Sequence, residues 1–188
     1  MKSITVENLL GNHKSYTQVT GDEEALKRVI QTGEINRPGF ELAGFFKHSD
    51  FRRIIVFGDK EMAFIAEMSE ERQKEIFPCL INEEVPCIVI CKGHECPKVL
   101  KDVANERNFP IFQTELITGA VSSELMNTLE EKLAKDTLMH GVFLNIHGKG
   151  VIIKGDSGIG KSEIALELVK RGHRSEERRV GKECGVRS

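Results

Sequence analysis

The sequence predicts an α/β protein that consists of a mixed α/β domain over residues 1–133, the incomplete start of a P-loop domain over residues 134–174, and a tail over residues 175–188. Two observations predict this class. In the first two thirds of the chain, helical periods alternate with short extended apolar runs, which is typical of a sheet covered by helices. Further on, an apolar β-branched run, a glycine-rich loop and an amphipathic segment follow one another.

Helices and strands are expected to alternate in the N-terminal domain. Three acidic residues before an apolar face predict a helix over residues 22–30. Ser69 precedes two glutamates and is expected to be the N-cap of a second helix. Val121 and three leucines at a spacing of four predict a long helix over residues 121–136. The other expected elements are strands over residues 54–58, 86–91 and 111–114 and a helix over residues 98–108.

The second domain is expected to begin with a hairpin. Residues 142–146 and 151–153 are apolar and extended in pattern, and they flank four turn residues, 147–150. The segment 163–171 places Ile164, Leu168 and Val169 on one helical face. The order is therefore strand, glycine-rich loop and helix.

Composition and net charge limit the kinds of binding partner and the cellular location that we expect. A chain of 188 residues with 39% hydrophobic residues and a net charge of -2 is typical of a soluble globular protein without an electrostatic footprint for nucleic acid or membrane. No signal peptide or membrane span is visible, so we expect a cytoplasmic protein. The five cysteines are irregularly spaced, which favours reduced thiols. Cys91, His94 and Cys96 form a Cys-x-x-His-x-Cys cluster, where we expect a strand end and a turn rather than a zinc site.

One motif carries specific chemistry. The pattern G-x-x-x-x-G-K-[ST], in which backbone N–H groups cradle nucleotide phosphates, is matched by Gly155, Asp156, Ser157, Gly158, Ile159, Gly160, Lys161 and Ser162. Lys161 is expected to reach the outer phosphates and Ser162 to bind Mg²⁺. The motif predicts ATP binding, and its alternative is a glycine-rich turn without a ligand.

Residues 139–174, together with Asn36-Arg37-Pro38-Gly39, Glu41-Leu42-Ala43-Gly44-Phe45 and the run 85–90, closely resemble bacterial HPr kinase/phosphorylase. The resemblance implies an ATP- and Mg²⁺-dependent enzyme that phosphorylates a serine of the phosphocarrier HPr, reverses the reaction by phosphorolysis, and regulates carbon catabolite repression. It implies that His140 and Lys161 are active-site residues and that the intact family forms homohexamers. A histidine has a pKa suited to proton handling or phosphate contact.

The resemblance ends after Arg174. The charged segment 175–188 has no core-forming period, and we interpret it as a foreign or frame-shifted tail, with a natural truncation as the alternative. The family's acidic catalytic residues are then absent, so we expect this copy to be inactive. Two other functions stay open: a different P-loop enzyme, such as a small-molecule kinase or a ligase, and a non-enzymatic interaction fragment.

Overall fold

The computed structural model describes residues 2–134, 141–156 and 158–172. The chain divides into two compact units, Met1–Ala134 and Lys135–Ser188. Two predicted site residues, His140 and Ser157, lie outside the described residues. The interpretation of the tail over residues 175–188 falls outside them as well.

A five-stranded sheet forms the centre of unit 1. Four strands are parallel, and β2 at one edge runs antiparallel to β7. The predicted strands over residues 54–58, 86–91 and 111–114 are confirmed as β5, β6 and β7. In spatial order the strands are β2 (Thr17–Thr20), β7 (Ile111–Gln113), β6 (Ile88–Ile90), β5 (Ile54–Phe57) and β4 (Ile35–Asn36).

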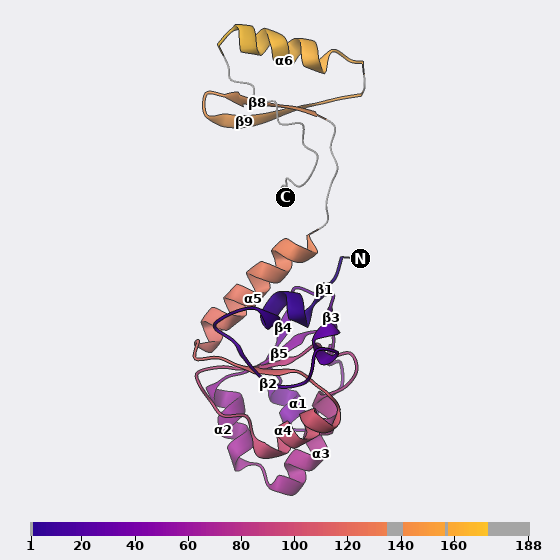
Figure 1. Cartoon of the computed structure of the whole chain (residues 1–188), viewed down its shortest axis with the longest axis vertical. Helices are drawn as coiled ribbons and strands as arrows, with labels where there is room; N and C mark the ends of the chain where they lie inside the picture. The colour runs from indigo at the N-terminus through magenta and orange to yellow at the C-terminus, as the bar shows by residue number, and fades with distance from the viewer. Residues whose placement is uncertain (1, 135–140, 157, 173–188) are drawn as a thin grey trace. The chain divides into compact units, whose positions relative to one another are not determined.

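The parallel strands follow one another across the sheet, which decides where the helices lie. Because crossovers between parallel strands are right-handed, a chain that winds in one direction places its crossover helices on one face. On that face lie α1 (Gly39–Leu42), α2 (Asp59–Glu67), α3 (Glu70–Leu80) and α4 (Lys98–Glu106) (Figure 1). The opposite face is covered by α5 (Thr118–Leu133) and the short helical segment η1 (Glu7–Gly11), near the two-stranded pair of β1 (Ile4–Thr5) and β3 (Val29–Ile30).

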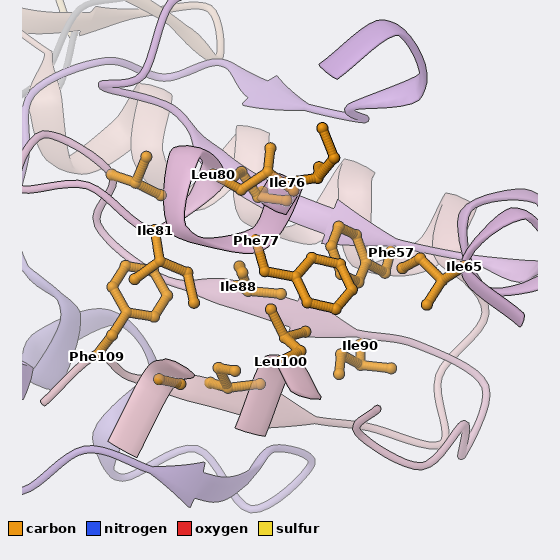
Figure 2. Close-up of a cluster of buried hydrophobic side chains, with 14 of the residues drawn as sticks. Phe57, Ile65, Ile76, Phe77, Leu80, Ile81, Ile88, Ile90, Leu100 and Phe109 are labelled. Carbon is orange, nitrogen blue, oxygen red and sulfur yellow. The ribbon is translucent and has the colours of Figure 1, made fainter. Parts of the chain in front are cut away.

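Alternation along the strands divides the core into two clusters. In β5, Ile55 and Phe57 pack toward α3 and α4, whereas Ile54 and Val56 pack toward α5. Figure 2 shows Phe57, Phe77 of α3 and Ile88 meeting in the first cluster. A parallel sheet that is covered on both faces needs apolar residues at every strand position. All four residues of β5 are accordingly buried.

The helix predictions are confirmed in part. α4 matches the expected helix over residues 98–108, and Ser69 caps α3, since its Oγ accepts a hydrogen bond from the backbone N–H of Arg72 at 3.2 Å. The boundaries expected for the long helix were wrong. α5 begins at Thr118 and ends at Leu133, because Ala134 has an extended ψ of 137°.

The helix expected over residues 22–30 was wrong. Asp22 Oδ1 accepts the backbone N–H groups of Glu24 at 2.9 Å and Ala25 at 3.0 Å, and this supports only the short segment η2 (Ala25–Lys27). At Arg28 the chain becomes extended, with ψ 139°. Ile30 then pairs with Ile4 in the β1–β3 ladder and is fully buried. The apolar residues that suggested one helical face are therefore divided between η2 and β3, and in β3 Ile30 is buried whereas Val29 is exposed.

Unit 2 contains the predicted hairpin, β8 (Gly141–Ile146) and β9 (Lys149–Lys154), followed by α6 (Lys161–Lys170). The turn has two residues rather than the expected four. His147 and Gly148 have φ values of 50° and 80°, the combination that a tight two-residue hairpin turn requires, and Ile146 pairs directly with Lys149. The helix begins two residues before its predicted start.

Candidate functional site

The candidate site is the loop between β9 and α6 in unit 2. The residues from Gly155 to Gly160 connect the end of the hairpin to the first turn of α6. α6 contacts both β8 and β9, and Figure 1 shows the helix running alongside the hairpin. The sequence motif therefore lies in the strand, loop and helix context that phosphate binding needs.

Two glycines shape this loop. Gly158 has φ 87° and Gly160 has φ 88°, in the left-handed region that residues with a side chain rarely adopt. Gly160 is also the N-cap of α6. A non-glycine residue at either position would strain the backbone, so the loop geometry explains both glycines.

The side chain of Lys161 is hydrogen-bonded to the backbone at the start of the same loop. Its ammonium group donates a hydrogen bond to the carbonyl oxygen of Gly155 at 2.7 Å and another to the carbonyl oxygen of Asp156. The side chain therefore reaches back over the loop instead of extending into solvent. Phosphate oxygens are stronger acceptors for a cation than neutral carbonyls, so a bound phosphate group competes favourably for this ammonium.

The first turn of α6 offers backbone donors. Gly160 provides no side-chain cap, and the N–H of Ile164 makes the bond to Gly160 O at 3.0 Å. The preceding N–H groups, including those of Lys161 and Ser162, therefore have no partner within the helix. Together with the helix dipole they favour an anion at this end. Glu163 is an acidic residue of the same turn and interacts favourably with the dipole.

An open hollow of about 740 Å³ lies over these groups. Gly141 and Val142 of β8 line it together with loop residues, Lys161 and the exposed Ser162. Ser162 therefore borders a space wide enough for a ligand of nucleotide size. The residues present fit a phosphate ligand with an accompanying Mg²⁺ ion, because a cation, free N–H donors and a hydroxyl converge on one hollow.

The structure brings together most of the predicted site. The residues that it describes there are Gly155, Asp156, Gly158, Ile159, Gly160, Lys161 and Ser162. Ile159 is 65% exposed and contributes a backbone position rather than packing. The role expected for His140 rests on the family resemblance, since this residue lies outside the described part.

A charged cluster in unit 1 was not expected from the sequence. It lies after β5 and β6, where Asp59 at the start of α2 pairs with Lys92 and with His94 Nε2, the latter at 2.9 Å. The hydrogen bond from Lys92 and, to a smaller extent, the one from His94 lower the pKa of Asp59. Each charged group in the cluster has a partner, so the cluster ties α2 to the turn that follows β6. The α2 helix itself was not predicted, and the acidic first turn at residues 59–61 is the signal that was available.

The Cys-x-x-His-x-Cys segment forms the expected strand end and turn. Cys91 is buried directly after β6, and Lys92 and Gly93 turn the chain with φ values of 61° and 66°. Burial raises the pKa of Cys91 to about 11 and that of Cys96 also to about 11. Across residues 2–134, 141–156 and 158–172, no three or more His, Cys, Asp or Glu side chains are grouped as metal ligands. In the same residues no helix has the length and apolar character needed to cross a membrane.

Comparison with known proteins matches both units. Residues 4–129 match the family described as "HPr Serine kinase N terminus", and residues 131–175 match "HPr Serine kinase C-terminal domain". An HPr kinase/phosphorylase of Exiguobacterium sp. is 45% identical over 84% of this chain and 50% of the relative. One from Enterococcus faecalis is 43% identical over 90% of this chain and 53% of the relative. The chain thus spans about half the length of these curated relatives.

A weaker similarity concerns a solved structure, the CBS and DRTGG domains of the regulatory region of Clostridium perfringens pyrophosphatase. It covers 66% of this chain and 48% of the other, with a TM-score of 0.44 and 17% identity. A similarity of this size carries no conclusion about fold or ligand.

Proposed function

The chain belongs to the HPr serine kinase family, and we propose that it supplies the nucleotide-binding loop of an ATP-dependent kinase/phosphorylase that acts on a serine of HPr. The observation that carries this proposal is the arrangement of Lys161 and the uncapped first turn of α6 around one hollow. The curated relatives bear the name HPr kinase/phosphorylase. Regulation of carbon catabolite repression follows as part of the proposal.

The residues would act on the nucleotide as follows. Lys161 would exchange its carbonyl partners for phosphate oxygens, and the first N–H groups of α6 would orient the same oxygens. Ser162 would hold Mg²⁺ through its hydroxyl. When bound, ATP supplies the transferred phosphoryl group and Mg²⁺ supplies positive charge next to its oxygens. Most of the catalysis would then come from positioning and charge neutralisation.

His140 is proposed as a further active-site residue on the strength of the family resemblance. A neutral imidazole near the transferred group would accept or return a proton, or contact phosphate when protonated. Cytoplasmic location and a homohexameric assembly of the intact protein belong to the same proposal.

The test is phosphoryl transfer in the complete protein that carries this chain. Incubation with γ-labelled ATP, Mg²⁺ and HPr should place the label on a serine of HPr. Replacement of Lys161 by alanine should reduce the rate by at least about a hundredfold, since one preorganised charge contact of this kind is worth about that much. Lys170→Ala is the matched control, because Lys170 is the exposed last residue of the same helix.

Three results would overturn the proposal in different ways. Label on a small metabolite would indicate a different P-loop enzyme. Equal rates for the Lys161→Ala and Lys170→Ala variants would remove the loop from the mechanism. Nucleotide-independent association with other copies of the protein, without any transfer, would indicate an interaction role.

A further inference from the structure

A second hollow lies in unit 1 beside the edge strand β4, and the proposed kinase chemistry does not use it. Its volume is about 200 Å³. Phe40, Glu41 and Phe45 line it together with Lys47 and His48. Glu41 and Phe45 belong to the run 41–45 that carries part of the family resemblance. The ordinary range for pockets that enclose a whole drug-sized ligand is about 300–1,000 Å³, so this hollow takes only part of one.

Glu41 is the buried charged residue of this hollow, with 8% of its surface exposed. The amide of Asn36 donates to Glu41 Oε1 at 3.2 Å, and the hydroxyl of Ser49 donates to the same oxygen at 2.9 Å. Within the described part of the chain, no donor is bonded to Oε2. Oε2 is not among the fully buried polar atoms that lack a partner, so it reaches the open space of the hollow and is available to a donor on a ligand.

Two aromatic rings stand beside this carboxylate. Phe40 is 79% exposed and Phe45 is 55% exposed, and their rings meet edge to face with centroids 6.4 Å apart. Exposed large aromatic side chains that gather at a concave site are typical of ligand binding. Their flat apolar surfaces favour a ligand with a planar ring.

The charges at the hollow favour an anionic group on the same ligand. Asp50 and Arg53 also line it, but Arg53 pairs with Asp50 at 3.5 Å and with Glu34 at 2.6 Å. Lys47 is exposed and has no acidic partner among residues 2–134. His48 lies beside it with a φ of 67°, a backbone conformation that is uncommon for a residue with a side chain. Lys47 is therefore a cation that a ligand can neutralise.

We propose that this hollow binds a nucleoside monophosphate, with an amino-bearing base inside and the phosphate outside. The base donates a hydrogen bond from its amino group to Glu41 Oε2 and packs against Phe40 and Phe45. The phosphate group lies toward Lys47. Such a ligand carries a hydrogen-bond donor for Glu41 Oε2, a planar ring for the two phenylalanines and an anion for Lys47. The site is separate from the phosphate-binding loop and does not depend on the proposed kinase function.

The test is an NMR titration of the full chain, in EDTA, that follows the backbone amides of residues 39–50. AMP and CMP should shift these amides saturably. Adenosine lacks the phosphate and ribose 5-phosphate lacks the base, so each should bind at least about tenfold more weakly than AMP. Absence of shifts in residues 39–50 at millimolar nucleotide would overturn the proposal, and so would equal binding of ribose 5-phosphate and AMP.

Glu41→Gln is the decisive variant. The remaining carbonyl oxygen still accepts from Asn36 and Ser49, but an amide NH₂ replaces Oε2 and faces the donor of the base. AMP affinity should fall about tenfold or more, because a donor would then oppose a donor. Lys47→Gln should weaken AMP while leaving adenosine unchanged. If Glu41→Gln binds AMP as the unaltered chain does, the base is not read by this carboxylate and the proposal fails.

A variant of the other site separates the two nucleotide proposals. Lys161→Ala should leave the AMP shifts of residues 39–50 unchanged, because they arise in unit 1. If the shifts disappear in this variant, the binding belongs to the phosphate-binding loop and the second site is refuted. Phe40→Ala should lower AMP affinity without unfolding unit 1, since the ring is mostly exposed.

Discussion

Phe77 in α3 is a side chain whose removal should strongly destabilise unit 1, and Phe40 provides a matched control. Phe77 is fully buried between α3, α4 and the sheet (Figure 2). An aromatic side chain of this kind buries about 150 Å² or more, which at about 25 cal/mol per Å² corresponds to about 4 kcal/mol. Phe77→Ala should therefore lower the free energy of unfolding by about 3–5 kcal/mol. Phe40 is 79% exposed, so the same change there should cost less than about 1 kcal/mol.

Urea unfolding followed by tyrosine fluorescence measures this difference. The sequence contains one tyrosine and no tryptophan, and Tyr16 is buried in unit 1 with 7% exposure, so its emission reports this unit alone. With a slope of about 2 kcal/mol per M urea, the midpoint should fall by about 2 M for Phe77→Ala and by less than about 0.5 M for Phe40→Ala. Equal shifts for the two variants would refute the assignment of Phe77 to the core.

Three further changes test other parts of unit 1. A methyl group added at Gly58 would collide with the side chain of Thr118, so Gly58→Ala should lower the melting temperature by several degrees. Gly119→Ala places its methyl group in open space within α5 and should raise the free energy of unfolding by up to about 1 kcal/mol, and a loss of stability there would contradict the helix geometry. The hydrogen bond from Arg52 to Asp50 lowers the pKa of Asp50 from 3.8 to about 2, so this carboxylate stabilises the fold above about pH 4 and the contribution is lost as the pH falls through about 2. In the Asp50→Asn variant, the free energy of unfolding should fall less between pH 4 and pH 2 than it does in the unaltered chain. An equal fall in both proteins would mean that other groups cause it.

The central strands and the loop between β9 and α6 could be predicted because their signals are local. The run Ile54–Phe57 is apolar at every position, as a strand buried on both faces must be, and the loop motif fixes its own glycines and lysine. The short edge elements could not be predicted in this way. β1 and β3 are two residues long and exist because Ile4 pairs with Ile30 across the intervening chain.

The hollow in unit 1 shows the same limit. Asn36 and Ser49 are 13 residues apart in the sequence, and only the crossover between β4 and β5 brings both to Glu41. A glutamate followed by a leucine carries no sign of burial by itself. The family resemblance marked the runs on both sides of Phe40, but the ligand-binding role proposed for this segment rests on the hydrogen bonds of Glu41, which only the folded chain shows.

The phosphate-binding role of the loop is tested most directly by an NMR titration of this chain with ATP and Mg²⁺, in the unaltered sequence and in the Lys161→Ala variant. The account predicts saturable shifts of the amides of Gly158, Gly160, Lys161 and Ser162, and their loss in the variant. The account would be contradicted if the amides of these four residues did not shift when ATP and Mg²⁺ are added. It would also be contradicted if they shifted equally in the Lys161→Ala variant.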